Sequence, residues 1–405
     1  MQNYTAAHDL LFDTGFRRSD YSTSGVTNTY KFEVQYAPVA DYRLRASYDK
    51  AIRAPSVVEL YNPQAVVTLN LGTDPCAPTY NANGTIAAPA AFSLQQCLHT
   101  GVTAAQYGNG GTTDIIPQGT GGQLSGLEGG NPALKPEQAE TYTLGLNFSP
   151  HQLPGLSGSI DYYHIALTDE INTIPSSVIF AQCGAGNQFF CSQIFRNPIT
   201  GGVTTIGAAS GGGYLYQTDV NIGAALVSGI DLQLAYKQAL PRGLGALNFE
   251  MNGAYLQHFE STPTPGAHTY DCAGYYGLTC QTVDFRWHHI LRTTWQTPWN
   301  FSAAATWRYL GPVSDDNNAP DPTMHFATFG GPDLFNAHIG SYSYLDLSAT
   351  WYVTKDVSIR AGANNVFDKD PPLINTTLVP GGEANTIDVY DMFGRQLFLS
   401  FTARF

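Results

Sequence analysis

The end of the chain, residues 395–405, alternates between apolar and polar side chains. An alternation with a period of two is typical of a β-strand that has one apolar and one polar face. The apolar face carries Leu397, Leu399, Phe401, Ala403 and Phe405, and Phe398 is the one large apolar residue on the other face. A soluble sandwich can contain such a strand, but a terminal strand of this kind leaves an aggregation-prone edge unless it is paired. A closed membrane barrel removes that edge, so we expect Phe401 and Phe405 to lie in a closing strand that serves barrel assembly.

The same alternation recurs along the whole chain. Together with the terminal stretch it predicts about eleven strands, and the others cover residues 30–36, 42–48, 141–148, 156–169, 230–237, 247–255, 285–296, 301–308, 345–351 and 357–364. The phase of the alternation is least clear over 156–169. Residues 1–24 are polar and irregular, and we expect them to form a loop.

The connections between these segments alternate between short turns and long loops. The long loops cover residues 53–137, 170–220, 260–282, 311–340 and 368–386. Transmembrane barrels show this asymmetry because their short turns face the periplasm and their long loops face outward, whereas a soluble sandwich has no reason to keep it. The sequence therefore predicts an all-β fold, an antiparallel transmembrane β-barrel that forms one domain over residues 1–405 with a polar inner face.

Composition excludes several other classes of protein. Charged residues are 13% of the chain, against roughly 25% in soluble domains. No run of eighteen apolar residues exists, so the sequence contains no helical membrane span. A net charge of -13 argues against a nucleic-acid partner, because phosphate binding requires clustered Lys and Arg. The N-terminus has neither the basic start nor the apolar core of a signal peptide.

Aromatic residues near the ends of the predicted strands favour the membrane interpretation. They include Tyr30, Tyr36, Tyr42, Tyr48, Phe148, Tyr236, Trp287, Trp295, Trp307 and Trp351. Tyr and Trp rings prefer the membrane–water boundary, although aromatic residues are also enriched in ordinary strands. On the apolar faces, His289 and His164 are the exceptions that a lipid-facing surface has to accommodate.

The six cysteines form three sequential pairs, and each pair lies within one long loop. The pairs are Cys76 and Cys97, Cys183 and Cys191, and Cys272 and Cys280. We expect three local disulfides and hence an oxidising compartment. Zinc or free thiols are the alternatives, but these spacings are poor for zinc and no His-x3-5-His motif accompanies them.

No motif for catalysis or for a cofactor stands out. The chain has no Gly-x-Ser-x-Gly, His-Glu-x-x-His, P-loop or dinucleotide fingerprint. The best material for a hydrolytic site is His288, His289 and Asp284, but no nucleophile can be paired with them. We therefore predict no enzyme activity, no metal site and no cofactor.

The long loops are the expected place for solute contact, since binding residues concentrate on loops held by a rigid scaffold. Tyr107, His325 and His338 are the side chains that we single out there. For each of them, an ordinary solvated loop residue is the competing explanation.

Four segments resemble the barrel of a TonB-dependent outer-membrane receptor. Residues 45–56 with Glu59-Leu60-Tyr61 resemble the strand exit of the family, which carries an Arg-Ala-Pro element. Residues 130–137, Gly-Asn-Pro-Ala-Leu-Lys-Pro-Glu, resemble the segment that opens the next strand. Residues 362–371 resemble the Asn-Asn-Leu-Phe-Asp-Lys element, and residues 390–405 resemble the closing strand. The four segments occur in the order of the family, and the resemblance covers roughly residues 25–405.

This resemblance implies a function and a set of partners. Such receptors have a 22-stranded barrel, filled by an N-terminal plug that contacts TonB, and take up scarce large solutes such as ferric siderophores. The chain shows neither plug nor TonB-contacting segment and matches the C-terminal half of the barrel, so we expect a fragment or a mis-assigned start. The partners implied are outer-membrane lipid, the TonB energy-coupling system, the barrel assembly machinery and a solute such as a ferric siderophore, at the cell outer membrane of a Gram-negative bacterium. A passive porin-like channel and an orphaned half-barrel are the alternatives.

Overall fold

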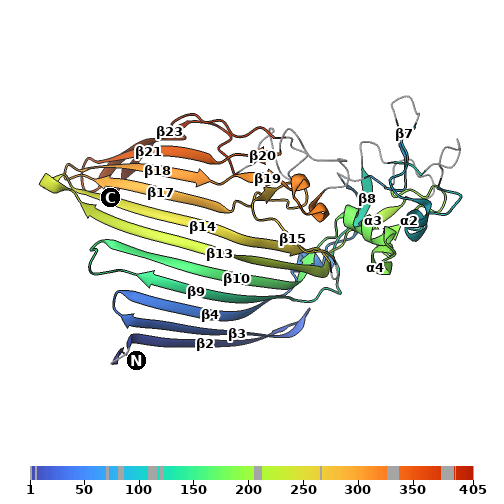
Figure 1. The fold of residues 1–405 in the computed structure, drawn as a ribbon, viewed down its shortest axis with the longest axis horizontal. Coiled ribbons are helices and arrows are strands. Elements are labelled where there is room, and N and C mark those ends of the chain that lie inside the picture. Colours follow the sequence, from blue (N-terminus) through green and yellow to red (C-terminus); the bar gives the residue numbers. More distant parts are fainter. Residues whose placement is uncertain are drawn as a thin grey trace.

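The computed structural model describes residues 2–4, 7–69, 73–80, 86–107, 116–118, 123–204, 212–264, 267–325, 337–374, 387 and 389–404. Its main element is a 14-stranded sheet, in which neighbouring strands are antiparallel and follow one another in chain order (Figure 1). In spatial order the strands are β1 (Gln2–Tyr4), β2 (Ala7–Tyr21), β3 (Gly25–Val39), β4 (Tyr42–Arg53), β9 (Glu137–Phe148), β10 (Leu156–Asn172), β13 (Val220–Ala239), β14 (Ala246–Thr262), β17 (Trp287–Gln296), β18 (Phe301–Leu310), β21 (Tyr342–Tyr352), β22 (Val357–Asn364) and β23 (Gln396–Ala403), and β15 (Tyr270–Asp271) pairs with β14. The all-β antiparallel fold is as predicted, and the eleven predicted strands are all present.

The expectation of a loop over residues 1–24 is wrong. Residues Ala7–Tyr21 form the long strand β2, which pairs with β3 from Asp9 to Tyr21. Its outward face carries Leu10, Phe12 and Phe16, but Leu11 on the opposite face and Thr14 within the outward row hide the alternation. The tight turn between β2 and β3 also departs from the predicted alternation of short turns and long loops. It lies at the end of the sheet where the other connections between strands of the sheet are long.

Strand register places the apolar faces of neighbouring strands on one side of the sheet. The paired residues Val34, Ala46, Leu144, Tyr162, Ile230, Tyr255 and Trp287 form one continuous row from β3 to β17. Many side chains of this face are exposed although they are apolar, among them Leu144 at 58% and Phe401 at 66%. Since a water-soluble protein rarely exposes so large an apolar surface, this outer face is suited to lipid.

Aromatic rings follow the outer face near both ends of the strands. At the end with the long loops, Tyr30, Phe32, Tyr48, Tyr142 and His164 form a row of ring contacts with centroids 4.8–6.2 Å apart. At the other end, Tyr236 stacks on Phe249 and Trp295 meets Trp299 edge to face. Two such rows of aromatic rings, one near each end of the strands, agree with the expected preference of aromatic residues for the two membrane–water boundaries.

The outward-facing His289 is enclosed by aromatic rings. Trp287 Nε1 donates a hydrogen bond of 2.9 Å to His289 Nδ1. The imidazole also stacks on Tyr309 and meets Trp307 edge to face, with centroid distances of 5.2 and 4.6 Å. His289 is 8% exposed, so its polar ring is covered although it lies on the apolar face.

The remaining secondary structure lies in the long loops, except for the 3-10 helix η1 in the short turn between β13 and β14. The strands are β5 (Ala65–Leu69), β6 (Thr79–Tyr80), β7 (Ile86–Ala88), β8 (Leu124–Glu128), β11 (Ile194–Phe195), β12 (Tyr214–Tyr216), β16 (Tyr275–Tyr276), β19 (Val313–Asp315) and β20 (His338–Ile339). The helices are α1 (Val57–Tyr61), α2 (Leu94–His99), α3 (Ser176–Gly184) and α4 (Gln188–Cys191), with short 3-10 helices η1 (Pro241–Gly243), η2 (Asp316–Asn318) and η3 (Pro322–Met324). Within the described residues, none of the helices has the length and apolar character needed to cross a membrane.

Candidate functional site

The two longest loops fold together into one packed unit, which we call the outer lobe and define as the described residues of 65–128 and 173–219. Figure 1 shows it beyond the ends of the strands, with α2, α3, α4 and β8 side by side. The sheet β11-β12-β8-β5 joins strands from both loops. One core packs Leu124, Ile179, Phe180 and Leu215, and another surrounds the disulfide between Cys76 and Cys97. The loops are therefore interdependent, which single-loop patterns in the sequence do not show.

A buried ion pair lies at the centre of the outer lobe. Arg196 binds both carboxylate oxygens of Asp74, through Nη1 at 2.6 Å and Nη2 at 3.1 Å. Arg196 Nε donates to the carbonyl of Thr100 and Nη1 donates to the carbonyl of Gly201. The side chains of Arg196 and Asp74 are 4% and 0% exposed. Because each charge is hydrogen-bonded and paired, the lobe tolerates burying them, but neither residue can be removed without leaving the other uncompensated.

A junction of polar side chains connects the outer lobe to the sheet. Arg53 at the end of β4 donates hydrogen bonds to Glu137 at the start of β9 and to Glu59 of α1. Glu59 also accepts from the backbone of Ser56, so the helix start is a capping box. Asn131 donates from its backbone to the carbonyl of Glu59. Two of the family-like segments, 45–61 and 130–137, thus meet here and hold each other in place.

The last three long loops form a second unit, the inner loop cluster, defined as the described residues of 263–286, 311–341 and 365–395. Its core packs Tyr276, Phe285, Val313 and Tyr390 against Tyr344 of β21. The parallel pair β16–β19 links the first of these loops to the second.

Asp316 connects two of these loops through hydrogen bonds, beside the disulfide between Cys272 and Cys280. Its Oδ2 accepts hydrogen bonds from the backbone N–H groups of Thr279 and Cys280 at 2.8 and 2.9 Å. A glycine is needed at position 277, where φ is +145° and a Cβ atom would lie 2.2 Å from Asp316 Oδ1. Burial outweighs these hydrogen bonds and raises the pKa of Asp316 to about 6. Burial likewise raises the pKa of Asp284 to about 6.

Arg308 attaches the inner loop cluster to the inner face of the sheet. It lies on β18 and binds Asp346 of β21 through Nε at 2.8 Å and Nη2 at 3.1 Å. The same guanidinium binds both oxygens of Asp391 in the last loop, at 2.9 and 2.5 Å, and lies 4.8 Å from the ring centroid of Tyr344. The last loop is therefore folded back against the inner wall. In the same loop, Asn365 accepts from the backbone of Lys369 and Asp368 accepts from Arg395, which ties the other two family-like segments together.

The inner wall itself carries charge pairs that cross strands. Arg45 of β4 reaches over β9 to Asp161 of β10, with Nη2 2.6 Å from Oδ2. Gly145 lies between them in register, and a Cβ atom there would be 1.9 Å from Asp161 Oδ1. Only glycine at this position therefore leaves room for the side chains of Arg45 and Asp161 to meet. Arg43 pairs with Asp9 at 2.9 Å. Both arginines line a hollow of about 710 Å³ near the short turns.

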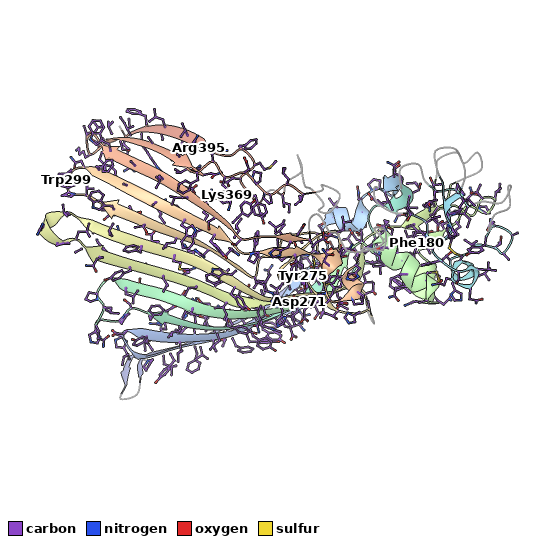
Figure 2. All side chains as sticks on the ribbon, turned by 45° about the horizontal axis from the view of Figure 1, so that its top comes forward. Phe180, Asp271, Tyr275, Trp299, Lys369 and Arg395 are labelled. Carbon is purple, nitrogen blue, oxygen red and sulfur yellow. A yellow bond between two sulfur atoms is a disulfide. The ribbon has the colours of Figure 1, made fainter. Side chains whose placement is uncertain are left out.

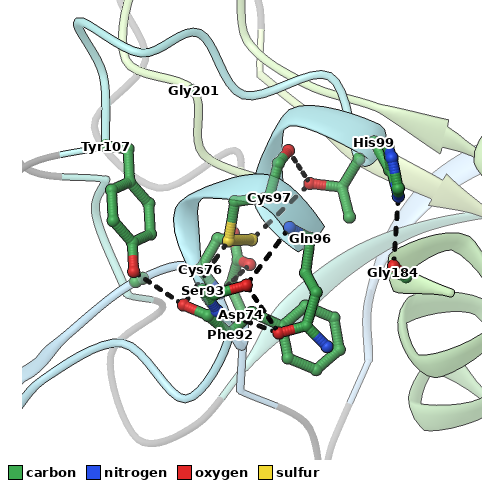
Figure 3. The surroundings of a disulfide bond; sticks show 12 residues. Asp74, Cys76, Phe92, Ser93, Gln96, Cys97, His99, Tyr107, Gly184 and Gly201 are labelled. Carbon is green, nitrogen blue, oxygen red and sulfur yellow. Dashed lines mark hydrogen bonds between the residues drawn. A yellow bond between two sulfur atoms is a disulfide. The ribbon is translucent and has the colours of Figure 1, made fainter. Parts of the chain in front are cut away.

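The structure places the three predicted contact residues in different loop assemblies. Tyr107 belongs to the outer lobe, where its hydroxyl donates a 2.7 Å hydrogen bond to the carbonyl of Phe92 (Figure 3). In the inner loop cluster, His325 Nε2 lies 2.8 Å from the carbonyl of Ala319, and His338 Nδ1 lies 3.3 Å from Ser314 Oγ. Their role in solute contact stays a prediction.

Other predicted residues also find their places. All six cysteines form the predicted disulfides. Phe401 lies on the outer face of β23 opposite Ile359, and Phe405 lies outside the described residues. His288 and His289 are consecutive in β17 and face opposite sides of the sheet, so they do not form one site.

Sequence reasoning missed Arg196 and Arg308, although Arg308 lay on the polar face of a predicted strand. Its partner Asp346 lay on the polar face of another predicted strand, so the sequence pattern did place Arg308 and Asp346 on the same kind of face. Arg196 and Asp74 lie in separate irregular loops, where no pattern relates them.

Comparison with known proteins identifies the fold. A family model described as "TonB dependent receptor-like, beta-barrel" matches residues 1–366. The chain belongs to this TonB-dependent receptor family. The family consists of outer-membrane receptors and not of enzymes, which agrees with the prediction of no catalytic activity.

The relatives of this TonB-dependent receptor chain include a ferrienterobactin receptor and siderophore receptors. The ferrienterobactin receptor of Escherichia coli (strain K12) is 28% identical over 179 residues, which cover 43% of this chain and 20% of that receptor. A solved structure of a ferric enterobactin receptor mutant from Pseudomonas aeruginosa, PfeA in complex with enterobactin, superposes with a TM-score of 0.60 and 17% identity. The siderophore receptor PirA from Acinetobacter baumannii superposes with a TM-score of 0.55 and 14% identity. These two matches cover 97% and 99% of this chain but 43% and 44% of the solved chains, so the chain spans less than half their length.

Proposed function

We propose that this chain forms part of the barrel wall and the loop region of a TonB-dependent outer-membrane receptor. The receptor takes up a ferric siderophore by active transport. The observation that carries the proposal is the family match over residues 1–366. The geometry agrees with it, because an apolar outer face, a charged inner wall and two disulfide-closed loop units are what such a receptor needs. Residues 1–405 form one barrel domain in this proposal, and the outer lobe is an elaboration of its loops.

The solute class is taken from the named relatives. The curated relative is a ferrienterobactin receptor, and the structural neighbours include a ferric enterobactin receptor and a siderophore receptor. A ferric siderophore is too large for diffusion through a narrow pore, so its uptake requires a dedicated receptor and coupling to TonB. The loops that contain Tyr107, His325 and His338 would make the first contact from outside the cell.

Two further proposed partners concern the outer face of the sheet and its last strand. Outer-membrane lipid covers the apolar outer face, in which Leu397, Leu399 and Phe401 of β23 are among the most exposed residues. The barrel assembly machinery recognises this last strand. Replacing Phe401 by Asp would place a charge against lipid and is expected to reduce the amount of folded receptor in the outer membrane.

Uptake of radiolabelled iron tests the function directly. A strain that expresses the full-length receptor is expected to accumulate iron from ferric enterobactin, and a strain without the gene is not. A protonophore or loss of TonB should abolish this uptake, because the energy comes from the inner-membrane proton gradient. Uptake that continued after either treatment would indicate a passive channel, and absence of uptake of any ferric siderophore would contradict the proposal.

A further inference from the structure

A second hollow lies on the inner wall, at the end of the sheet where the turns are short. It encloses about 530 Å³ between the ends of β17, β18, β21 and β22. Figure 2 marks this end of the sheet by Trp299, whose turn contributes Thr297 and Asn300 to the lining. Most of the other lining residues are hydroxyl or amide side chains, including Thr294, Gln296, Ser302 and Thr350.

The hollow carries positive charge. Among the described residues that line it, Arg292 and Arg360 are the charged ones, and none is a carboxylate. Arg292 Nε donates to the hydroxyl of Thr294 at 3.3 Å, and the guanidinium of Arg360 lies 5.4 Å from the ring centroid of Phe398. Within the described residues, neither arginine forms an ion pair. Arg292 of β17 and Arg360 of β22 line opposite edges of the hollow, with β18 and β21 between them. A recess with two arginines and several hydroxyl groups is notable in a chain with a net charge of -13.

The first hollow of the inner wall shows the difference. Its arginines, Arg43 and Arg45, are paired with Asp9 and Asp161, and its lining also contains Asp41 and Glu250. Arg292 has Glu250 as its cross-strand neighbour in β14, yet its guanidinium bonds to Thr294 instead, toward the second hollow. One hollow is therefore neutralised by the wall itself, whereas the arginines of the other have no ion-pair partner among the described residues.

We propose that the second hollow is an anion-binding subsite, with Arg292 and Arg360 as its binding residues. Its ligand has carboxylate or phenolate oxygens, because guanidinium forks and hydroxyl groups match such oxygens in geometry and charge. A recess with one sign of charge in an otherwise acidic protein concentrates anions locally and does so less at high salt. The anion comes either from a solute in passage, which rests on the proposed function, or from an acidic side chain of the receptor outside residues 1–405.

The test uses the full-length receptor in detergent and pyrenetetrasulfonate as a fluorescent anionic probe. The double variant Arg292→Gln/Arg360→Gln removes both charges and keeps polar side chains. Arg17→Gln is the matched control, because Arg17 lies on the inner wall at β2, also donates from Nε to a hydroxyl two residues on, and lines neither hollow. Arg292→Lys/Arg360→Lys keeps the charge and shows whether the double variant acts through charge rather than folding.

The subsite predicts that the receptor binds the probe at low salt and that the double variant binds it at least about tenfold more weakly, which corresponds to about 1.4 kcal/mol. The control should bind within about twofold of the parent protein. The lysine variant should bind more tightly than the double glutamine variant and less tightly than the parent, because it keeps the charge but loses the guanidinium forks. A different result would identify the anion as an acidic side chain of the receptor. In that case the parent protein binds no probe, and the melting temperature falls in the double variant but not in the control.

Equal probe binding and equal melting temperature in the parent, the double variant and the control would overturn the inference. The proposed function is judged separately by iron uptake in the parent strain. Slower uptake in the double variant, with normal affinity for ferric enterobactin at the cell surface, would assign the subsite to a solute in passage.

Discussion

The outer lobe and the inner loop cluster are both built from long loops closed by disulfides, yet they are attached to the sheet in opposite ways. The outer lobe contains its own charged centre, Arg196 with Asp74. It meets the strands around Arg53 and Glu137, and its core packs against the start of β13. The inner loop cluster is fastened to the inner wall by Arg308, which belongs to a strand. The difference teaches that a charged group inside one unit can be removed while the charge pairs of the sheet stay intact, whereas the charged group that holds the other unit belongs to the sheet itself.

This comparison also separates what the family-like segments do from what a solute would recognise. Those segments supply Arg53, Glu59, Asn131, Asp368 and Arg395, which hold loops to strands and to one another. They explain the fold that the chain shares with its relatives. In the proposed function, recognition of the solute would fall to the loop surfaces between them.

The largest effect is expected from Arg196→Ala. Asp74 would remain buried without its partner, at a cost of about 3–5 kcal/mol. The outer lobe should lose protection in amide hydrogen exchange, while amides of β9 and β18 keep theirs in the full-length protein. Arg404→Ala, at an exposed position after β23, is the control and should change neither region. Simultaneous loss of protection in lobe and sheet would show that the two units are not independent.

A pH dependence should distinguish the inner loop cluster. Asp316 is 1% exposed and has a pKa of about 6 in the folded protein, above its ordinary value of 3.8. The folded state therefore keeps this proton to higher pH than the unfolded state, and the stabilisation, about 2–3 kcal/mol, is complete below pH 4 and lost as the pH rises through 6. Asp284 shifts in the same direction.

The amides of Thr279 and Cys280 report this change, because both donate to Asp316. Their protection, corrected for the intrinsic pH dependence of exchange, should fall between pH 4 and 6 and stay level above that range. Asp316→Asn should flatten most of the profile, since an amide does not titrate. A profile that rises with pH would contradict the assignment.

A smaller effect, of about 1–3 kcal/mol, is expected when the link between cluster and wall is cut by Arg308→Ala. Phe393 is 81% exposed in the last loop, so a spin label on Phe393→Cys reports the mobility of that loop without competition from the six disulfide-bonded cysteines. The label should become more mobile in Arg308→Ala. Asp346→Asn should change it little, because the contact between Arg308 and Asp391 remains. Unchanged mobility in both variants would show that the loop is held by its apolar core.

The sequence predicted the sheet well because its signal is local. Each strand of the wall shows one face to lipid, so side chains two residues apart share a chemistry that can be read without knowing the neighbours. The signal failed at β2, where Leu11 faces inward and Thr14 interrupts the outward row. Contacts between loops have no such period. Arg196 and Asp74 are 122 residues apart, and only the folded lobe shows that they meet.

The smallest predicted effect concerns Tyr107, a candidate for solute contact whose hydroxyl is engaged within the outer lobe. Tyr107→Phe removes the hydrogen bond to the carbonyl of Phe92 and should lower the stability of the lobe by about 1 kcal/mol. If the hydroxyl serves the lobe alone, the affinity of the full-length receptor for ferric enterobactin stays the same. A tenfold loss of affinity with unchanged amide protection in the lobe would instead show that the hydroxyl turns toward the solute. Because Phe keeps the ring, the comparison isolates the hydroxyl, and it decides whether the outer lobe binds through side chains that its own fold already uses.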